Sequence, residues 1–273
     1  SPEGLHWDCR RVKCLGKAKL RDIVVFNYPS GDTLMSSPNY QAQDFYIACY
    51  TIGRQVYSSR YDLDSLSPMQ RRQYFEGIYS AGRQYIQANK GEYGEIITRP
   101  TDRRENYVKR CVGLPGQTLQ IKDRIIYLDG KANKEPDNVQ YTYHVKLKQS
   151  LNDDLMKELG ISMEDLMSLN TTGVMPLTKR AVEVFKSRHD LVESISLNTD
   201  ASDIEIYPLN GNKHWTRDNY GPVWIPAKGK SIKLTLDNLP IYERPIRAYE
   251  KNKLEVRDGK IFINGKQTDQ YTF

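Results

Sequence analysis

Histidine and cysteine are scarce in this sequence, with four of each among 273 residues. The chain has no Cys-x-x-Cys and no His-Glu-x-x-His. The residues that a catalytic metal site or a Ser-His-Asp triad requires are therefore few. Four cysteines are also too few for a disulfide framework in a chain of this length. Cys9 and Cys14 are close enough in sequence to form a bridge, whereas the apolar neighbours of Cys49 and Cys111 are typical of core packing.

Long apolar runs are absent as well. The longest, such as residues 23–26 (Ile-Val-Val-Phe), are the size of a strand and far short of the roughly 18 residues that span a bilayer. The first residues lack the charged and apolar regions of a secretory signal peptide, and the chain begins with Ser1 rather than Met, which we interpret as a trimmed N-terminus. With 38% hydrophobic and 27% charged residues, we expect a globular chain of one large domain or two ordinary ones.

The net charge of +6 comes from 40 basic and 34 acidic residues spread along the chain. The only concentrations are short pairs, at 10–11, 71–72, 103–104 and 109–110. No nucleic-acid motif accompanies them, so we expect no nucleic-acid partner. Most of these pairs are explained equally well as solvated surface or as weak attraction to an anionic membrane surface.

The pattern of apolar residues predicts several elements. Residues 21–28 are typical of a buried strand, while residues 44–58 fit neither helix nor strand clearly. A helix is predicted from Ser67, which can cap it, with Pro68 at its first position. It should end near Asn89 and stop at Gly91. Residues 239–252 predict a short helix, with Pro245 favouring a break.

Two segments far apart in the chain repeat one pattern. Residues 119–131 align without a gap on residues 254–266. Each consists of an alternating strand, a turn at Asp123 or Asp258, a second strand and a final Asp-Gly or Asn-Gly turn, which is the signature of a hairpin. We therefore expect one hairpin used twice in a β-rich body.

Residues 137–220 differ from the β-rich remainder, because helix patterns alternate with strand patterns there. The sequence predicts strands at 141–147 and 191–197, and helices at 151–159, 162–169 and 178–188, the second with a capping box at Ser162-Met-Glu-Asp165. We expect residues 1–136 and 221–273 to form a β-rich core, and residues 137–220 to form an inserted α/β subdomain, peripheral to it.

Two short segments carry the chemistry. One is residues 22–26 (Asp-Ile-Val-Val-Phe); the other is residues 107–116 (Tyr-Val-Lys-Arg-Cys-Val-Gly-Leu-Pro-Gly). In this order they resemble two boxes of the type I signal peptidases, and in the second box ten consecutive positions fit. Arg21 stands where that family has Gly, and Gln117 where it has Asp.

The resemblance implies that Lys109 is the catalytic base of a Ser-Lys dyad. A lysine at its ordinary pKa is protonated at neutral pH, but apolar neighbours disfavour its charged form, and a neutral amine can deprotonate a serine. Val108, Cys111, Val112 and Leu114 are the neighbours we expect to supply this cover.

The same resemblance suggests roles for residues around the lysine. Tyr107 and Val108 are similar to positions that line the family's pocket for small side chains. Arg110 is expected to pair with a carboxylate. Structural support is expected from Asp22, Gly113, Pro115 and Gly116.

Two boxes of the family are missing from the 273 residues. The nucleophile's box, Ser-Met-x-Pro-Thr-Leu, has only a faint echo at residues 173–178, where Val replaces Ser. The box Gly-Asp-Asn-Arg, which should follow the second hairpin, is not reached. We therefore expect a chain that holds the base but lacks the catalytic serine, and that is inactive by itself.

These observations predict a mainly-β fold of coiled antiparallel sheets with an α/β insert. The function they imply is that of a membrane-associated serine endopeptidase that removes signal peptides from secretory preproteins. It would need no cofactor, would be anchored in the cell membrane, and would place this portion on the extracytoplasmic (periplasmic) face, in contact with the lipid surface. Two alternatives stay open: a Ser-Lys autoprotease of the repressor type, and a non-catalytic peptide- or partner-binding module on the same fold.

Overall fold

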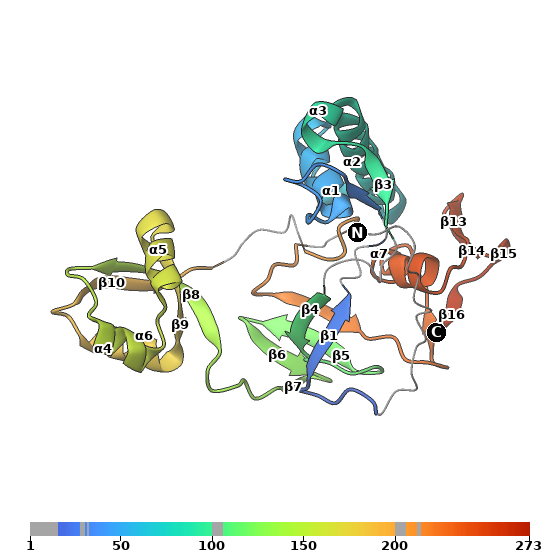
Figure 1. Cartoon of the computed structure of the whole chain (residues 1–273). Coiled ribbons are helices and arrows are strands. Elements are labelled where there is room, and N and C mark those ends of the chain that lie inside the picture. Colours follow the sequence, from blue (N-terminus) through green and yellow to red (C-terminus); the bar gives the residue numbers. More distant parts are fainter. Residues whose placement is uncertain (1–15, 28–30, 32, 100–105, 200–205, 212–213) are drawn as a thin grey trace, which may run out of the picture.

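The structure is a computed structural model, which describes residues 16–27, 31, 33–99, 106–199, 206–211 and 214–273. Cys9 and Cys14 lie outside these ranges. The strands form several small antiparallel sheets, as expected, but about 32% of the chain is helical and 28% is strand. The fold is thus only loosely mainly-β, because helices are as abundant as strands (Figure 1).

The first strand pair joins segments far apart in the chain. Strand β1 (Ile23–Asn27) pairs antiparallel with β4 (Asn106–Arg110), so that Ile23 lies opposite Arg110 and Asn27 opposite Asn106. The two asparagine side chains hydrogen-bond at 2.9 Å at one end. This two-stranded ribbon is not extended by a further strand in the described part of the chain.

A pair of helices lies between β1 and β4 in sequence. The ambiguous segment forms α1 (Phe45–Val56), capped by Asp44. As predicted, α2 (Pro68–Ala88) begins after Ser67, which forms a capping box with Gln70. A 3₁₀ turn (Leu63–Ser65), α3 (Lys90–Tyr93) and the strand pair β2 (Thr33–Met35) and β3 (Ile96–Thr98) complete this unit.

Two glycines let α1 and α2 approach closely. A Cβ on Gly82 would lie 1.9 Å from the carbonyl oxygen of Cys49, and one on Gly53 would lie 2.0 Å from that of Ile78. Cys49 is fully buried, with Phe45 and Ile86, in the small core between the helices. The expected core packing of Cys49 is therefore observed, while Cys111 is half-buried.

The two predicted hairpins are present. Strands β5 (Thr118–Lys122) and β6 (Ile125–Leu128) form the first, extended by β7 (Lys131–Ala132) and, on the other side, by β11 (Tyr220–Trp224). Strands β13 (Leu254–Arg257), β14 (Lys260–Ile263) and β15 (Lys266–Gln267) form the second.

Both hairpins use the same turn geometry. The pairs Asp123-Arg124 and Asp258-Gly259 have positive φ at both residues, between 47° and 72°. This is the left-handed conformation of a type I′ turn, whose twist matches that of the flanking strands. The repeat seen in the sequence is thus a repeat of structure.

The C-terminal part packs around a separate small core. It contains α7 (Leu239–Arg244), a π-helical turn (Pro245–Tyr249) where the break at Pro245 was predicted, and the pair β12 (Ser231–Lys233) and β16 (Gln270–Thr272). Leu239 and Ile246 are fully buried there, against the second hairpin.

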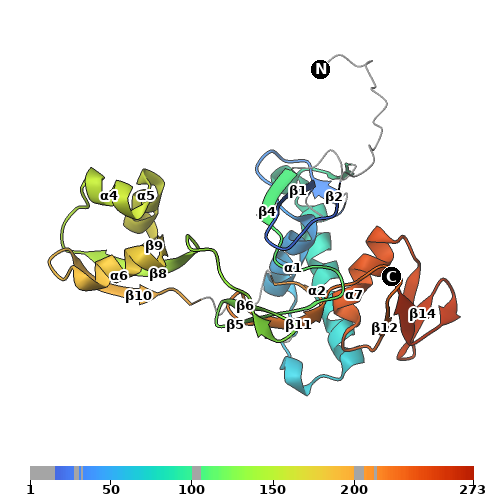
Figure 2. The same cartoon turned by 90° about the horizontal axis from the view of Figure 1, so that it is seen from below.

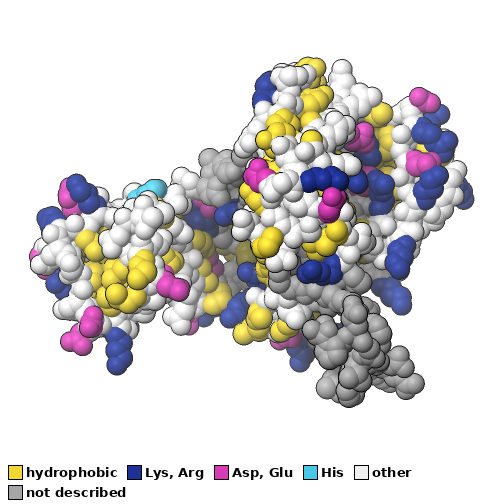
Figure 3. Space-filling view, turned by 45° about the horizontal axis from the view of Figure 1, so that its top comes forward, with side chains coloured by type: hydrophobic (Ala, Val, Ile, Leu, Met, Phe, Trp, Pro, Cys, Tyr) yellow, Lys and Arg dark blue, Asp and Glu magenta, His cyan; other side chains and the backbone are white. Residues whose placement is uncertain are grey.

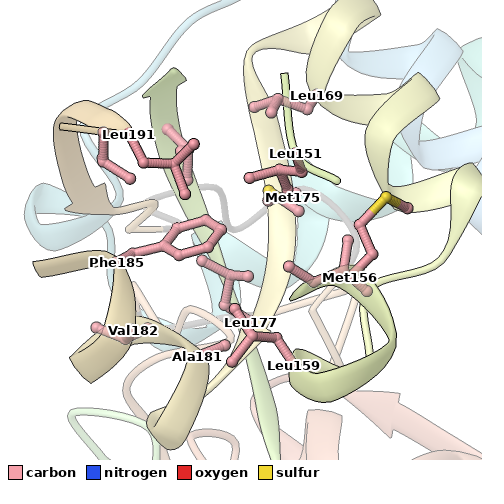
Figure 4. Close-up of a cluster of buried hydrophobic side chains, with 13 residues drawn as sticks. Leu151, Met156, Leu159, Leu169, Met175, Leu177, Ala181, Val182, Phe185 and Leu191 are labelled. Atoms are coloured by element: carbon pink, nitrogen blue, oxygen red, sulfur yellow. The ribbon is translucent and has the colours of Figure 1, made fainter. Parts of the chain in front are cut away.

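Residues 140–197 build a sheet and a core of their own. Strand β8 (Gln140–Leu147) lies between β10 (Val192–Leu197) and β9 (Val174–Thr178), and α4 (Asp153–Leu159), α5 (Met163–Thr172) and α6 (Lys179–Ser187) pack on it. Met175, Leu177 and Phe185 are almost completely buried in this core (Figure 4). In two views the unit extends to one side of the rest of the chain (Figures 1 and 2).

Candidate active site

The β1–β4 ribbon brings the two boxes together. Lys109 lies opposite Val24, and Tyr107 lies opposite Phe26. Because alternate residues of a strand point to the same face, these four side chains share one face of the ribbon. The Lys109 Nζ is 6.0 Å from the centre of the Tyr107 ring, and the Phe26 and Tyr107 rings are 6.5 Å apart.

The Lys109 side chain is exposed. Of the residues expected to cover it, Val108 is 60% exposed and points to the opposite face, and Val112 is 37% exposed. Cys111 and Leu114 are half-buried. Within the described residues, the Tyr107 ring lies near Lys109 on the same face, but the four residues expected to cover the lysine leave its side chain exposed.

Tyr107 and Val108 point to opposite faces of the ribbon. Tyr107 is half-buried beside Phe26, on the lysine's face. Val108 lies opposite Val25 on the other face, where Ile23 and Val25 are each 66% exposed. The ribbon thus carries an exposed apolar face behind the lysine, which the sequence did not predict.

The segment after the lysine is a tight turn docked on β11. The Gly116 N–H donates to the Ile225 carbonyl at 2.8 Å, and the Ile225 N–H donates to the Gln117 carbonyl at 2.8 Å. A Cβ on Gly113 would lie 2.6 Å from the Ile225 side chain, and Gly116 has a φ of +90°. The left-handed conformation of Gly116 thus favours glycine there, whereas a side chain at Gly113 would displace the end of the Ile225 side chain. Pro115, between them, is exposed.

The substitution at Gln117 leaves this turn closed. Its side-chain oxygen accepts a hydrogen bond from the Leu114 N–H at 2.9 Å, and its N–H donates to the Leu114 carbonyl at 3.1 Å. A side-chain carbonyl here can replace the carboxylate oxygen of an aspartate as acceptor. Gln117 therefore closes the turn through its own hydrogen bonds to Leu114, although the family has Asp at this position.

The other departure from the family pattern, Arg21 in place of Gly, lies just before β1. Arg21 has a φ of +77°, a left-handed conformation that suits Gly better than any other residue. Its N–H donates to the Cys111 carbonyl at 2.8 Å, and the Cys111 N–H donates to the Asp22 carbonyl at 2.7 Å. The Asp22 carboxylate accepts from the Lys19 N–H at 2.8 Å. The backbone groups of Arg21 and Asp22 thus join the start of β1 to the residue that follows β4.

Arg110 supports the same end of the ribbon. Its Nη1 donates to the Arg21 carbonyl at 3.0 Å, so its partner in the described structure is a backbone oxygen where a carboxylate was expected. The bond joins the two strands next to the lysine.

Other chemistry is not assembled in the described part of the chain. No group of three or more His, Cys, Asp or Glu residues there is placed to hold a metal ion. The faint serine-box echo, residues 173–178, belongs to β9, in a different sheet from Lys109. Among the described residues, no helix is long and apolar enough to cross a membrane. Basic side chains are scattered over several elements rather than gathered into one patch on the face that Figure 3 shows.

Over 155 residues the chain is 27% identical to a signal peptidase I of Rickettsia akari, covering 53% of this chain and 52% of that protein. A signal peptidase I of Bacillus licheniformis is 45% identical over 49 residues, 17% of this chain and 26% of that protein. A signal peptidase IB of Staphylococcus aureus is 33% identical over 58 residues, 21% of this chain and 29% of that protein.

The chain thus spans about half the length, or less, of these curated relatives. No solved structure matches it. The family model for signal peptidase, peptidase S26, matches residues 7–172, more than half of the chain and including both boxes of the β1–β4 ribbon. The chain belongs to the signal peptidase family, peptidase S26.

Proposed function

We propose that this chain is the base-bearing part of a membrane-associated serine endopeptidase that removes signal peptides from secretory preproteins, with Lys109 as general base. The observation that carries the proposal is the pairing of β1 with β4. Two boxes from opposite ends of a long intervening segment form neighbouring strands, with Lys109 opposite Val24 and followed directly by the docked glycine turn.

The exposed ribbon fits this role. It has no third strand within the described residues, so an extended substrate can add to it as a strand, a common way to bind peptides. A substrate strand and the segment that carries the serine would then cover Lys109. Burial by these partners would disfavour its ammonium form and make it a base toward the serine hydroxyl.

The serine has to come from outside residues 1–273, because no Ser-Met-x-Pro box occurs in them. We therefore expect purified residues 1–273 to leave a preprotein uncut in detergent. Robust cleavage that persists through further purification would mean that another nucleophile is present.

We further propose that the ribbon faces the outer surface of the cytoplasmic membrane. Ile23, Val25 and Val108 are each at least 60% exposed on one face, which is unusual for apolar side chains gathered together. Contact with lipid would cover them while leaving Lys109 accessible on the other face.

The mechanism is tested in the full-length protein with a preprotein substrate. Replacing Lys109 by Ala removes the base and should slow cleavage by at least about a hundredfold. Lys109→Arg should not restore activity, because a guanidinium stays protonated. Lys122→Ala is a matched control, since Lys122 is likewise an exposed lysine on a strand, with its Nζ 5.2 Å from the centre of the Tyr127 ring. Near-normal cleavage by Lys109→Ala would refute the proposed role.

A further inference from the structure

The inserted unit, residues 140–197, has an apolar core of its own. Among the described residues, every buried or partly buried member of that core lies within this range. The core therefore stabilises the unit itself. The orientation of the unit on the rest of the chain depends on contacts made elsewhere, near the points where the chain enters and leaves it.

The two repeated hairpins differ at the second residue of their turns. The second hairpin has Gly259 there, with a φ of +72°, a conformation that glycine adopts without steric cost. The first hairpin has Arg124 at the aligned position, with the same φ of +72°. A residue with a side chain is strained in this conformation. The contacts of the Arg124 side chain have to offset that strain.

The Arg124 side chain reaches the chain on both sides of the inserted unit. Its Nη1 donates to the Asp218 carboxylate at 3.0 Å, just before β11, and its backbone N–H donates to the Asp218 carbonyl at 2.8 Å. Its guanidinium lies 5.8 Å from the centre of the Tyr141 ring, near the start of β8. The Tyr141 hydroxyl also lies 3.4 Å from the Arg124 carbonyl oxygen. Arg124 thus bridges the entry to the unit and the segment that follows it.

Glu135 ties the linker between β7 and β8 to the same unit. Its carboxylate accepts one hydrogen bond from the Tyr141 hydroxyl and another, at 2.9 Å, from the Nζ of Lys179, the first residue of α6. Burial raises the pKa of Glu135, but the hydrogen bonds from Tyr141 and Lys179 outweigh it and lower the pKa overall. The carboxylate is therefore charged at neutral pH.

Three members of this network are shielded from solvent. The side chains of Glu135, Arg124 and Asp218 are 19%, 25% and 16% exposed. By contrast, the ion pair of Lys146 with Glu193, in the unit's own sheet, is 67% and 48% exposed. Exposed pairs are strongly screened and stabilise little, whereas partly buried pairs are screened much less. The contacts at the boundary are thus the stronger ones.

We propose that Arg124 and Glu135 form a polar joint that holds the inserted unit in a fixed orientation on the first hairpin, so that the two parts tumble as one body. The joint explains why an arginine occupies a turn position that suits glycine. Its side chain links Tyr141, inside the unit, to Asp218, outside it.

The joint also connects the unit to the sheet that supports the Lys109 strand. The turn after that strand is docked on Ile225, directly after β11, through the backbone of Gly116 and Gln117. Strand β11 belongs to the same sheet as the first hairpin. The inference stands apart from the proposed cleavage, because Arg124 and Glu135 lie outside both boxes.

The test measures tumbling of the isotope-labelled 273-residue chain by relaxation of its amide nitrogens. In the unaltered chain, the amides of β8, β9 and β10 should give the same rotational correlation time as those of β5, β6 and β11. The double variant Arg124→Gly with Glu135→Gln removes the joint. The correlation time of the unit should then fall about twofold below that of the hairpin sheet, as expected for domains that move independently.

Two further variants act as controls. Lys146→Gln breaks the exposed pair with Glu193 inside the unit and should leave one common correlation time. The double variant should fold, because it gives the first hairpin the glycine that the second hairpin already has at Gly259; if it does not, the same reading is taken from Lys179→Gln, which alters only an exposed side chain of the joint. The proposal is overturned if the unaltered chain already shows two correlation times, if the folded double variant (or Lys179→Gln in its place) keeps a common one, or if Lys146→Gln loosens the unit as much.

Discussion

The close approach of α1 and α2 makes Gly82 a sensitive position. Replacing it by Ala would put a Cβ 1.9 Å from the Cys49 carbonyl oxygen and 2.8 Å from the Gly53 N, whereas such carbons essentially never come within 3.0 Å of another atom. Both obstacles are backbone atoms, so the helices have to separate by about 1 Å, and a core as densely packed as a protein interior resists this.

The size of the effect follows from two opposing terms. Overpacking of a well-filled site costs about 1–3 kcal/mol, and a backbone clash belongs at the upper end. Alanine regains about 1 kcal/mol of helix propensity over glycine. We expect a net loss of about 2 kcal/mol, which lowers the melting temperature by roughly 4–8 °C for a chain of this size.

Gly91→Ala is the matched control. Gly91 lies in α3, and a Cβ there meets nothing within 4 Å, so the change should be neutral or stabilising by up to about 1 kcal/mol. Thermal unfolding followed by circular dichroism measures both variants. If Gly82→Ala melts at or above the temperature of Gly91→Ala, the helices do not pack as described.

Three further predictions follow from other contacts. Arg21→Gly relieves a left-handed residue and should stabilise the chain by about 1 kcal/mol, seen as a higher melting temperature; a lower one would mean that the Arg21 side chain matters more than its backbone. Burial raises the pKa of Glu243, but hydrogen bonds from two arginines outweigh it and lower the pKa overall; Glu243→Gln should therefore cost about 3 kcal/mol at pH 7. That cost should shrink as pH falls below the unfolded value of about 4.3, through the lower folded pKa, and a cost that stays constant down to pH 2 in urea melts would contradict the ion pair. Replacing residues 140–197, which build a sheet and core of their own, by a Gly-Ser linker in the full-length protein should leave a folded core and cleavage of a short peptide, whereas unfolding would show that the segment is not accessory.

Local signals in the sequence were sufficient for much of the fold. Ser67 and Pro68 mark the start of α2, Ser162 marks that of α5, and the repeated Asp-containing turns give both hairpins, because caps and type I′ turns depend on a few neighbouring residues.

Most features that the sequence did not predict depend on contacts between residues far apart in the chain. The segment 44–58 is an exception, because its helix signals are local: Asp44 caps it, and the buried residues recur at helical spacing from Phe45 to Gly53. The expected cover of Lys109, in contrast, depends on distant contacts. Neighbours in sequence, such as Val108, alternate to the opposite face of a strand, so cover for the lysine has to come from segments distant in sequence or from a bound peptide. The contacts of Arg124 and Glu135 were also missed, because their partners Asp218 and Lys179 lie far along the chain.

The pairing of Ile23 with Arg110 also sets an order of events during folding. The ribbon closes a loop that contains the whole α1–α2 unit. Closing this loop costs chain entropy before the distant strand pair can gain its hydrogen bonds. The helices, whose contacts are local, can form first and shorten that loop. We therefore expect the strand that bears Lys109 to be among the last elements to acquire its native hydrogen bonds, so that a chain with a defective helical pair would lose the β1–β4 pairing even though neither Gly53 nor Gly82 lies in it.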